Sequence, residues 1–246
     1  MKKLIVNADD YGLTYGVCKG IIKACNDGIV RSTTVMINMP EIENKIELLN
    51  YCNNLKTGVH LNVTCGEPVS DPKDVPTLLN DEGSFWRKPD IVIEKADFSQ
   101  VEKEWTAQIE KALKLGLKIS HIDTHHHSHT KPQLTDIYMK LAKKYNIAAR
   151  SNNPAMAEHF RQNGVKTTDY FIEEFYGDKV SKENFIKIIN NLSDGSTEVC
   201  SHPAFIDDEL VKISSYREYR LNELETYIDK DILNLITQNN IEITSF

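Results

Sequence analysis

Short apolar runs alternate with amphipathic helical stretches along this 246-residue chain, and this alternation constrains its fold most. Runs of four to eight apolar or β-branched residues without polar alternation are typical of parallel strands covered on both faces. We expect strands at residues 4–7, 32–37, 58–64, 118–123, 147–151, 170–172, 197–203 and 241–243. Helical patterns at residues 14–28, 40–49, 99–116, 132–142, 181–192 and 217–237 separate most of them.

This order predicts an α/β fold in which parallel strands are covered by outer helices. A distorted (β/α) barrel of the TIM type fits best, and an open, doubly wound sheet is the alternative. The sequence contains no internal repeat, linker or low-complexity tract. Because a chain of this length can bury one large core, we expect residues 1–246 to form a single domain.

Five of the eight histidines lie between His121 and His129, together with Asp123. An affinity tag or a metal-scavenging tract would also be rich in histidine. This segment, however, lies in the middle of the chain, includes Ile122 and Thr124, and follows an apolar run. Imidazole binds divalent transition metals and transfers protons near neutral pH. A packed histidine explains any single member better than it explains five.

Chemically active side chains lie at or near the carboxyl ends of five of the expected strands. They are Asp9, Asp10, His60, Asp123, His125, Arg150 and His202. Both candidate folds place the active site at this edge of the sheet. This coincidence is the strongest argument from the residues themselves that the chain has a functional site.

Two histidines and a carboxylate with open positions can hold a divalent ion that activates water. Asp10, His60 and His125 could form such a set, although Asp10 could equally belong to a solvated turn and His60 to the core. Adjacent residues of an extended segment point to opposite sides, so Asp9 and Asp10 should differ in role. Asp9 could then orient or deprotonate water.

Hydrolysis also needs an acid for the leaving group, and His202 could supply it. The segment around His202 could instead be a tight structural turn. Arg150 could orient a carboxylate or bind substrate, whereas on the surface it would carry no function.

Several functional classes find no support in the sequence. Lys and Arg total 29 against 36 Asp and Glu, giving a net charge of -7 without a basic block. Nucleic acid and anionic membranes are therefore poor partners. Dinucleotide, phosphate-loop, serine-hydrolase and zincin motifs are absent.

No apolar run reaches the roughly 18 residues that cross a bilayer, and the N-terminus lacks a signal-peptide core. We therefore expect a cytoplasmic protein. The five scattered cysteines include no close pair of the zinc-ribbon type. We expect them to be reduced and mostly buried.

Four separated motifs, in order, resemble those of the YdjC-like carbohydrate deacetylases, a group that includes chitooligosaccharide deacetylase. They are Asn7-Ala8-Asp9-Asp10-Tyr11-Gly12, Gly58-Val59-His60-Leu61-Asn62-Val63-Thr64, His121-Ile122-Asp123-Thr124-His125-His126-His127-Ser128-His129 and Cys200-Ser201-His202-Pro203-Ala204-Phe205-Ile206-Asp207. The segment Arg220-Leu221-Asn222-Glu223-Leu224 also fits, so the resemblance covers nearly the whole chain. Tyr11 and Ser128 depart from the usual phenylalanine and valine.

The resemblance implies a distorted barrel, one divalent ion, and hydrolysis of an N-acetyl group on a small acetylated sugar. Such sugars include a chitooligosaccharide or an N-acetylglucosamine derivative, with acetate released. By motif, Asp10, His60 and His125 match metal ligands, Asp9 the base, and His202 is the candidate acid.

The remaining members of the histidine segment, among them Asp123 and His127, are expected to orient His125 or to face substrate, and Arg150 is expected at substrate or a carboxylate. The family implies Mg²⁺ and a possible homodimer. Two nitrogens and one oxygen suit Zn²⁺ or another transition metal at least as well.

Two other functions stay open on the sequence alone. A metal-dependent phosphoesterase on a barrel would need a second ion and further carboxylates. A non-catalytic sugar- or metal-binding protein would have no particular need for Asp9 or His202. The long segment 65–89 reads as a binding loop, whose Phe85 and Trp86 could stack on a ligand or cover the barrel rim.

Overall fold

All eight expected strands are present in the computed structural model, which describes residues 1–246. The strands are β1 (Lys2–Tyr11), β2 (Ser32–Val35), β3 (Lys56–Leu61), β4 (Ile119–Thr124), β5 (Ala148–Ala149), β6 (Tyr170–Ile172), β7 (Gly195–Ser201) and β8 (Glu242–Ile243). The helices are α1 (Tyr15–Asn26), α2 (Ile42–Glu47), α3 (Pro89–Lys95), α4 (Phe98–Lys114), α5 (Pro132–Tyr145), α6 (Pro154–Gln162), α7 (Lys182–Asn191), α8 (Asp208–Ile213), α9 (Glu218–Tyr227) and α10 (Lys230–Gln238).

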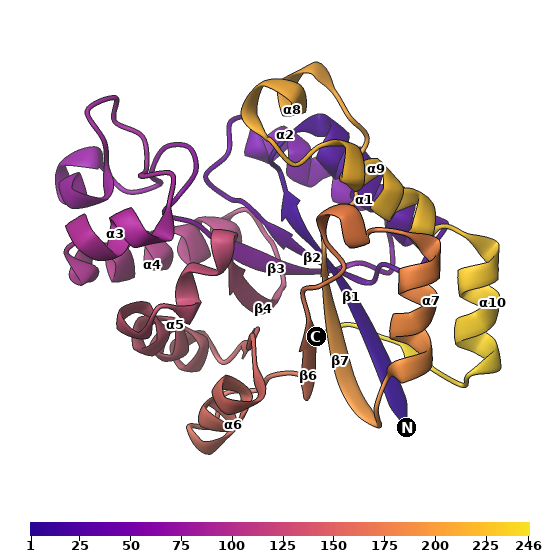
Figure 1. Ribbon diagram of the computed structural model, residues 1–246. Helices are drawn as coiled ribbons and strands as arrows, with labels where there is room; N and C mark the ends of the chain where they lie inside the picture. Colours follow the sequence, from indigo (N-terminus) through magenta and orange to yellow (C-terminus); the bar gives the residue numbers. More distant parts are fainter.

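The strands form one parallel sheet in the order β5-β4-β3-β2-β1-β7-β6, with β8 paired to the start of β1. This is the circular strand order of a barrel that is interrupted between β5 and β6. The sheet curls, and helices surround it (Figure 1). The expected distorted (β/α) barrel is confirmed, and the open doubly wound sheet is not found.

Strand β1 is longer than its apolar run suggested, and this length positions two acidic residues. Pairing with β2 continues to Tyr11, which lies opposite Val35. Asp9 and Asp10 are therefore buried residues near the carboxyl end of a strand rather than residues of a solvated loop. Because all the strands are parallel, their carboxyl ends meet at one edge, as the sequence predicted.

Most helices follow the expected apolar stripes. Val101, Trp105 and Ile109 of α4 are all buried. The helix begins one residue before the expected 99–116 pattern, and the Asp97 carboxylate caps it by accepting from the Ser99 backbone N–H at 2.9 Å. None of the helices is long and apolar enough to cross a membrane.

The expected single helix over 217–237 is instead two helices, α9 and α10. Asp229 separates them, since its carboxylate accepts from the Asp231 N–H and caps α10. The short helices α3, α6 and α8 were not expected, because each spans fewer than ten residues and gives little periodic signal.

The segment 65–89 covers the barrel rim. Phe85 is buried and its strand-like bridge to Leu79 closes the loop. The Trp86 indole donates to the Thr77 carbonyl at 3.1 Å and carries the Lys95 ammonium over its ring. These contacts favour the covering role of both aromatic rings over ligand stacking.

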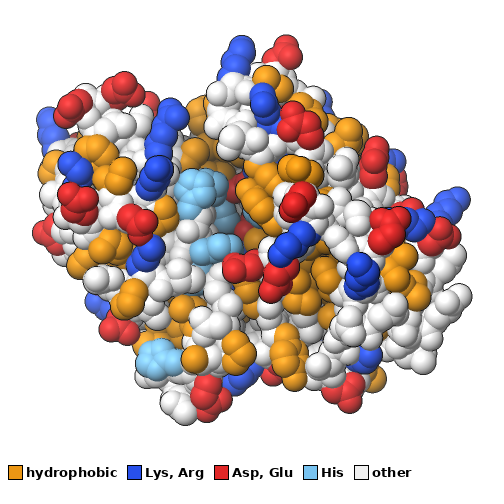
Figure 2. All heavy atoms as spheres, in the orientation of Figure 1, with side chains coloured by type: hydrophobic (Ala, Val, Ile, Leu, Met, Phe, Trp, Pro, Cys, Tyr) orange, Lys and Arg blue, Asp and Glu red, His pale blue; other side chains and the backbone are white.

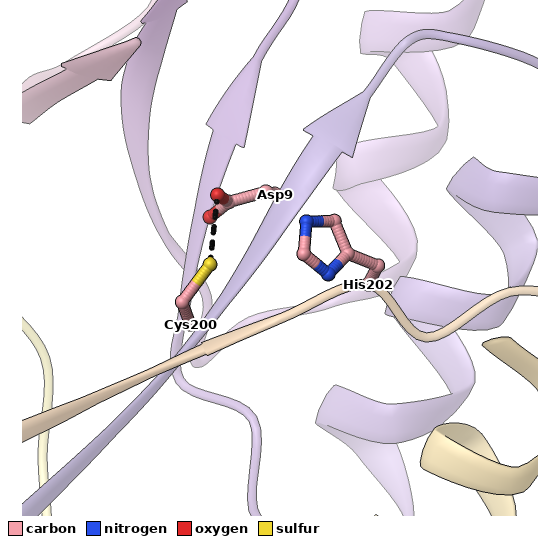
Figure 3. A group of neighbouring side chains, drawn as sticks. All are labelled: Asp9, Cys200 and His202. Atoms are coloured by element: carbon pink, nitrogen blue, oxygen red, sulfur yellow. Dashed lines mark hydrogen bonds between the residues drawn. The ribbon is translucent and has the colours of Figure 1, made fainter. Parts of the chain in front are cut away.

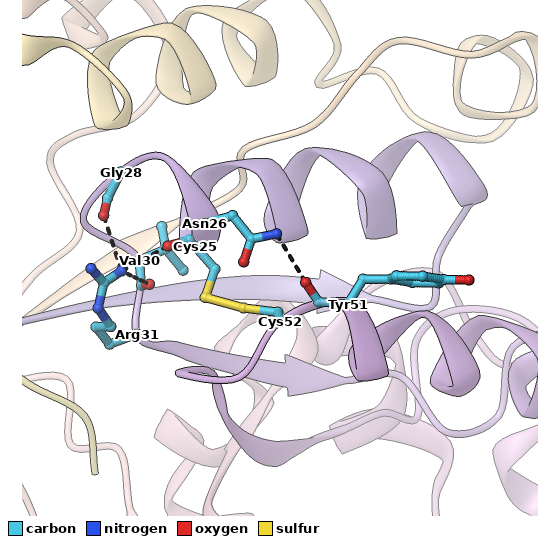
Figure 4. The surroundings of a disulfide bond; sticks show 7 residues. All are labelled: Cys25, Asn26, Gly28, Val30, Arg31, Tyr51 and Cys52. Atoms are coloured by element: carbon cyan, nitrogen blue, oxygen red, sulfur yellow. Dashed lines mark hydrogen bonds between the residues drawn. A yellow bond between two sulfur atoms is a disulfide. The ribbon is translucent and has the colours of Figure 1, made fainter.

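A disulfide joins Cys25, at the end of α1, to Cys52, before β3 (Figure 4). The expectation of five reduced thiols was therefore wrong for this pair. The two cysteines are 27 residues apart, and only the packing of α1 against the segment before β3 brings them together. Arg31 supports the same corner, since it donates to the carbonyls of Cys25, Gly28 and Val30.

Candidate active site

Three side chains from three strand ends converge on one point. Asp10 Oδ1 lies 3.3 Å from His60 Nε2 and 3.2 Å from His125 Nδ1, and the two histidine nitrogens are 3.3 Å apart. These are the residues that the sequence nominated as metal ligands, brought together from β1, β3 and the turn after β4.

The donor set fits a divalent cation. Ligand atoms bound at about 2.1 Å lie about 3.0–3.4 Å apart in octahedral or tetrahedral sites. Asp10 Oδ1 is buried, and the two histidine nitrogens are its only close polar neighbours, so a cation held by the three atoms would satisfy it. Both observations support an ion-binding role for this group of residues.

Asp10 is oriented by its backbone and by Arg220. Its φ of 68° lies in the left-handed region, which is uncommon outside glycine. The Arg220 guanidinium donates to Asp10 Oδ2 at 2.8 Å, which leaves Oδ1 for the two histidines. Burial alone would raise the pKa of Asp10, but Arg220 and the neighbouring histidines hold it well below its usual range.

His60 is oriented by Asp123, the aspartate of the histidine-rich segment. His60 Nδ1 donates to Asp123 Oδ1 at 2.7 Å, and Thr34 donates to the other oxygen at 2.9 Å. This arrangement leaves Nε2 of His60 free to bind an ion. The sequence had associated Asp123 with His125, whereas the structure places it on His60.

The carboxylates around His60 also change its protonation. Burial alone would lower the pKa of His60, but Asp123, Asp10 and Asp9 raise it to about 10. His60 is therefore protonated at neutral pH, and binding of an ion at Nε2 would release this proton.

Asp9 lies beside this cluster and is held by Arg150. The Arg150 guanidinium donates to both oxygens of Asp9 at 2.7 Å, in a bidentate pair that is fully buried. Burial alone would raise the pKa of Asp9, but Arg150 holds it well below its usual range. Arg150 is thus a carboxylate-orienting residue, and it does not lie on the surface. Arg150 also contacts Asp123 and Glu198, at 3.0 and 2.8 Å.

His202 and Cys200 approach Asp9 from the end of β7 (Figure 3). The Cys200 thiol donates to Asp9 Oδ2 at 3.3 Å, and His202 faces the same carboxylate. Burial lowers the pKa of His202 to about 4, so its imidazole is neutral in the free protein. Its Nδ1 atom is buried without a hydrogen-bond partner.

Helix α9 supplies an arginine and a glutamic acid to the site. Arg220 reaches Asp10, and Glu223, three residues later, accepts from the backbone N–H of His202 at 2.5 Å. Tyr216 donates to the other oxygen of Glu223 at 2.5 Å. Burial raises the pKa of Glu223 to about 8.

The loop after His202 is docked on α1 and α9. Ala204 donates to the Arg220 carbonyl, and Phe205 donates to the Gly16 carbonyl, both at 3.1 Å. Gly20 faces this loop so closely that an added Cβ would overlap the backbone of Ala204. The glycine therefore sets the distance between α1 and the His202 loop.

Replacing Gly20 with alanine should displace this loop, because the obstructing atoms are backbone. We expect the free energy of unfolding to fall by about 1–3 kcal/mol, a typical cost of overpacking. Urea titration measures this change, with exposed Lys19→Ala on the same helix as the control. A Gly20→Ala protein as stable as the Lys19→Ala protein would contradict the expected clash.

The remaining histidines of the segment have separate surroundings. His121 bonds Asn7 Oδ1 at 3.0 Å and stacks on Phe246, whereas His129 stacks on Tyr138. His126 and His127 have φ values of 54° and 49°, a kink that directly follows His125.

His127 is about a third exposed, with its Nε2 atom 3.7 Å from Glu173. The sequence predicted that His127 orients His125 or faces substrate. In Figure 2, pale-blue histidine side chains line one wall of a cleft, and hydrophobic side chains form the opposite wall.

The sequence missed several site residues, chiefly Arg220, Glu223 and Glu198. Arg220 and Glu223 belong to one of the recognised motifs, and their spacing of three places them on one helix face. Glu198 is fully buried in β7 and contacts Arg150. A charged residue within an apolar strand was the available signal for Glu198.

Comparison with known proteins gives a consistent result. The family model described as YdjC-like protein matches residues 3–238. A curated carbohydrate deacetylase from Thermoanaerobacter pseudethanolicus is 43% identical over 246 residues, covering 100% of this chain and 98% of the relative.

Solved structures agree with this family match. A structure from Enterococcus faecalis V583, described as a cellobiose-phosphate cleavage protein, has a TM-score of 0.94 at 33% identity, covering 99% of this chain and 97% of the other. A family 4 carbohydrate esterase from Streptomyces lividans, solved with acetate, has a TM-score of 0.55 at 8% identity, covering 100% and 92%, and shares the fold alone. With the family model matching nearly the whole chain, the chain belongs to the YdjC-like protein family.

Proposed function

We propose that this chain is a metal-dependent carbohydrate deacetylase, which hydrolyses the N-acetyl group of a small acetylated sugar and releases acetate. A chitooligosaccharide or an N-acetylglucosamine derivative is the proposed substrate, and one domain spanning residues 1–246 carries the activity. The observation that supports this most is the convergence of Asp10, His60 and His125 beside an arginine-bound Asp9. The curated carbohydrate deacetylases among its relatives support the same reaction.

Asp10, His60 and His125 are the proposed ligands of one divalent ion. Such an ion polarises a carbonyl oxygen and lowers the pKa of water, chemistry that amide hydrolysis requires. Mg²⁺ is the ion that the family resemblance suggests, whereas two imidazole nitrogens and one carboxylate oxygen favour a transition metal such as Zn²⁺.

Asp9 is the proposed general base. Its carboxylate is ionised at neutral pH and adjoins the ion-binding cluster, so it can take a proton from the attacking water. The water oxygen adds to the acetyl carbonyl carbon, and the C–N bond then breaks. The electron pair of that bond leaves with the sugar amine, and the acetyl group leaves as acetate.

His202 is the proposed acid for the leaving amine. Because its imidazole is neutral in the free protein, it must gain a proton during turnover. Negative charge that develops on the oxygen of the tetrahedral intermediate favours the imidazolium form. Glu223 holds the His202 backbone while this charge changes.

The phosphoesterase alternative is weaker because a second ion would need Asp9 as a ligand. The two other groups of possible ligands, Asp9-Cys200-His202 and Asp9-His60-Asp123, both require Asp9. Both oxygens of Asp9 are already bonded to Arg150. A second ion would have to break this buried pair.

The proposed function is tested by incubating metal-loaded protein with mono- and diacetylated chitosugars and measuring acetate and free amine. We expect the two products in equal amounts, and loss of both after chelation with recovery on adding metal. Sugar phosphates and p-nitrophenyl phosphate serve as comparison substrates. Phosphate release without acetate release would support the phosphoesterase, and binding without any product would support a sugar-binding protein.

A further inference from the structure

Three tyrosines form a stack beside His202, outside the residues that the mechanism uses. The Tyr176 and Tyr216 rings are nearly parallel, with an interplanar angle of 8° and centroids 4.1 Å apart. Tyr219 continues the stack on Tyr216, with centroids 5.8 Å apart. His202 meets the edges of the Tyr176 and Tyr216 rings at 5.7 and 5.6 Å.

The members of this stack differ in what they are free to do. The Tyr216 hydroxyl donates to Glu223, so this tyrosine is committed to the support of the His202 loop. Tyr176 packs on Tyr216 but remains 48% exposed, and Tyr219 remains 37% exposed. Phe205 and Ile206, three and four residues beyond His202, are also exposed.

An exposed aromatic ring held rigidly next to a polar reaction centre suits a pyranose. The axial C–H groups of a sugar ring present a flat apolar face, which an aromatic ring can cover while the hydroxyls stay solvated. Tyr176 is already immobilised by Tyr216, so binding costs little additional side-chain entropy. Tyr176 lies beside His202, the proposed acid for the sugar amine. A neighbouring sugar ring of the same substrate is therefore the group expected to bind to Tyr176.

We propose that the Tyr176–Tyr216 pair is a sugar-binding subsite, in which Tyr176 stacks on the pyranose ring next to the one that loses its acetyl group. This subsite rests on the proposed deacetylase function and makes Tyr176 a residue that selects disaccharides over monosaccharides. Tyr216 acts as its support.

The test compares N-acetylglucosamine with N,N′-diacetylchitobiose in metal-loaded enzyme. Tyr176→Ala should lower kcat/KM for the disaccharide about two- to tenfold more than it lowers kcat/KM for the monosaccharide, the value of one aromatic contact. Tyr176→Phe should keep the disaccharide rate. Tyr170→Ala is the matched control, because Tyr170 is similarly exposed but lies at the start of β6, whereas Tyr176 follows the carboxyl end of that strand.

Three results would overturn the subsite. They are an unchanged disaccharide rate in Tyr176→Ala, an equal fall for both sugars, and the same selective fall in Tyr170→Ala. The equal fall would mean that Tyr176 acts on the catalytic residues instead of the neighbouring sugar. Thermal melting of each variant shows that a lost rate is not lost folding.

A second measurement separates the subsite from the proposed function. Cellobiose has no acetyl group, so its binding, followed by saturation-transfer NMR against glucose, does not depend on turnover. Weaker cellobiose binding in Tyr176→Ala would support the subsite even if no acetylated sugar is hydrolysed. Unchanged cellobiose binding would overturn it even if deacetylation is observed.

Discussion

Asp9→Asn is expected to lower the deacetylation rate by roughly 10²–10⁴-fold while metal binding is kept, the range for loss of a general base. The amide retains the size of the carboxylate but cannot take a proton from water. Asp9 does not belong to the Asp10-His60-His125 cluster, so the ion should bind as before. Steady-state acetate release gives the rate, and isothermal titration with Zn²⁺ gives the metal affinity.

Asp9 also has an unusual balance of properties for a base. Arg150 keeps it ionised, yet the same pairing makes it a weak proton acceptor. A water whose pKa is lowered by a bound ion can still give its proton to a weak base. Metal binding is therefore measured separately from the rate, so that a loss of the base is not mistaken for a loss of the ion. Asp27→Asn, on the exposed end of α1, is the control. Unchanged acetate release in Asp9→Asn would remove Asp9 from the mechanism.

His60→Ala and His125→Ala are each expected to weaken metal binding roughly 10²-fold or more and to abolish turnover at ordinary metal concentrations. Each removes one of three protein donors, a larger loss than that of an outer partner, which costs about 10–100-fold. Bound metal after desalting, measured by mass spectrometry, and titration of the metal-free protein give the affinity.

The matched control for these two variants is His159→Ala, because His159 is exposed on α6 and far along the chain from the cluster. A full complement of metal in both His60→Ala and His125→Ala would refute the assigned ligand set. Metal loss in His159→Ala would show instead that the protein binds ions through surface histidines.

The positions of the strands could be predicted because each depends on a local apolar run. The extra length of β1 could not, since Asp9 and Asp10 look like a turn until Arg150 and Arg220 compensate their buried charges. The break between α9 and α10 depends on a cap at Asp229 within an otherwise continuous apolar stripe.

In the candidate site, the residues at strand ends could be predicted, but their hydrogen-bond partners could not. The residues that end strands were nominated because parallel topology brings strand ends together. Their partners were not, because hydrogen bonding is decided by tertiary packing. Asp123 adjoins His125 in sequence but bonds His60 from a neighbouring strand, and Cys25 meets Cys52 across 27 residues.

Arg220 and Glu223 lie on the same short helix, α9, but contact different parts of the candidate site. Arg220 restrains the carboxylate of the ion-binding cluster, and Glu223 restrains the backbone of the proposed acid. A rotation of α9 that releases one contact also strains the other. We therefore expect ion binding by the cluster and the orientation of His202 to be coupled, so that the protein without an ion has a less ordered His202.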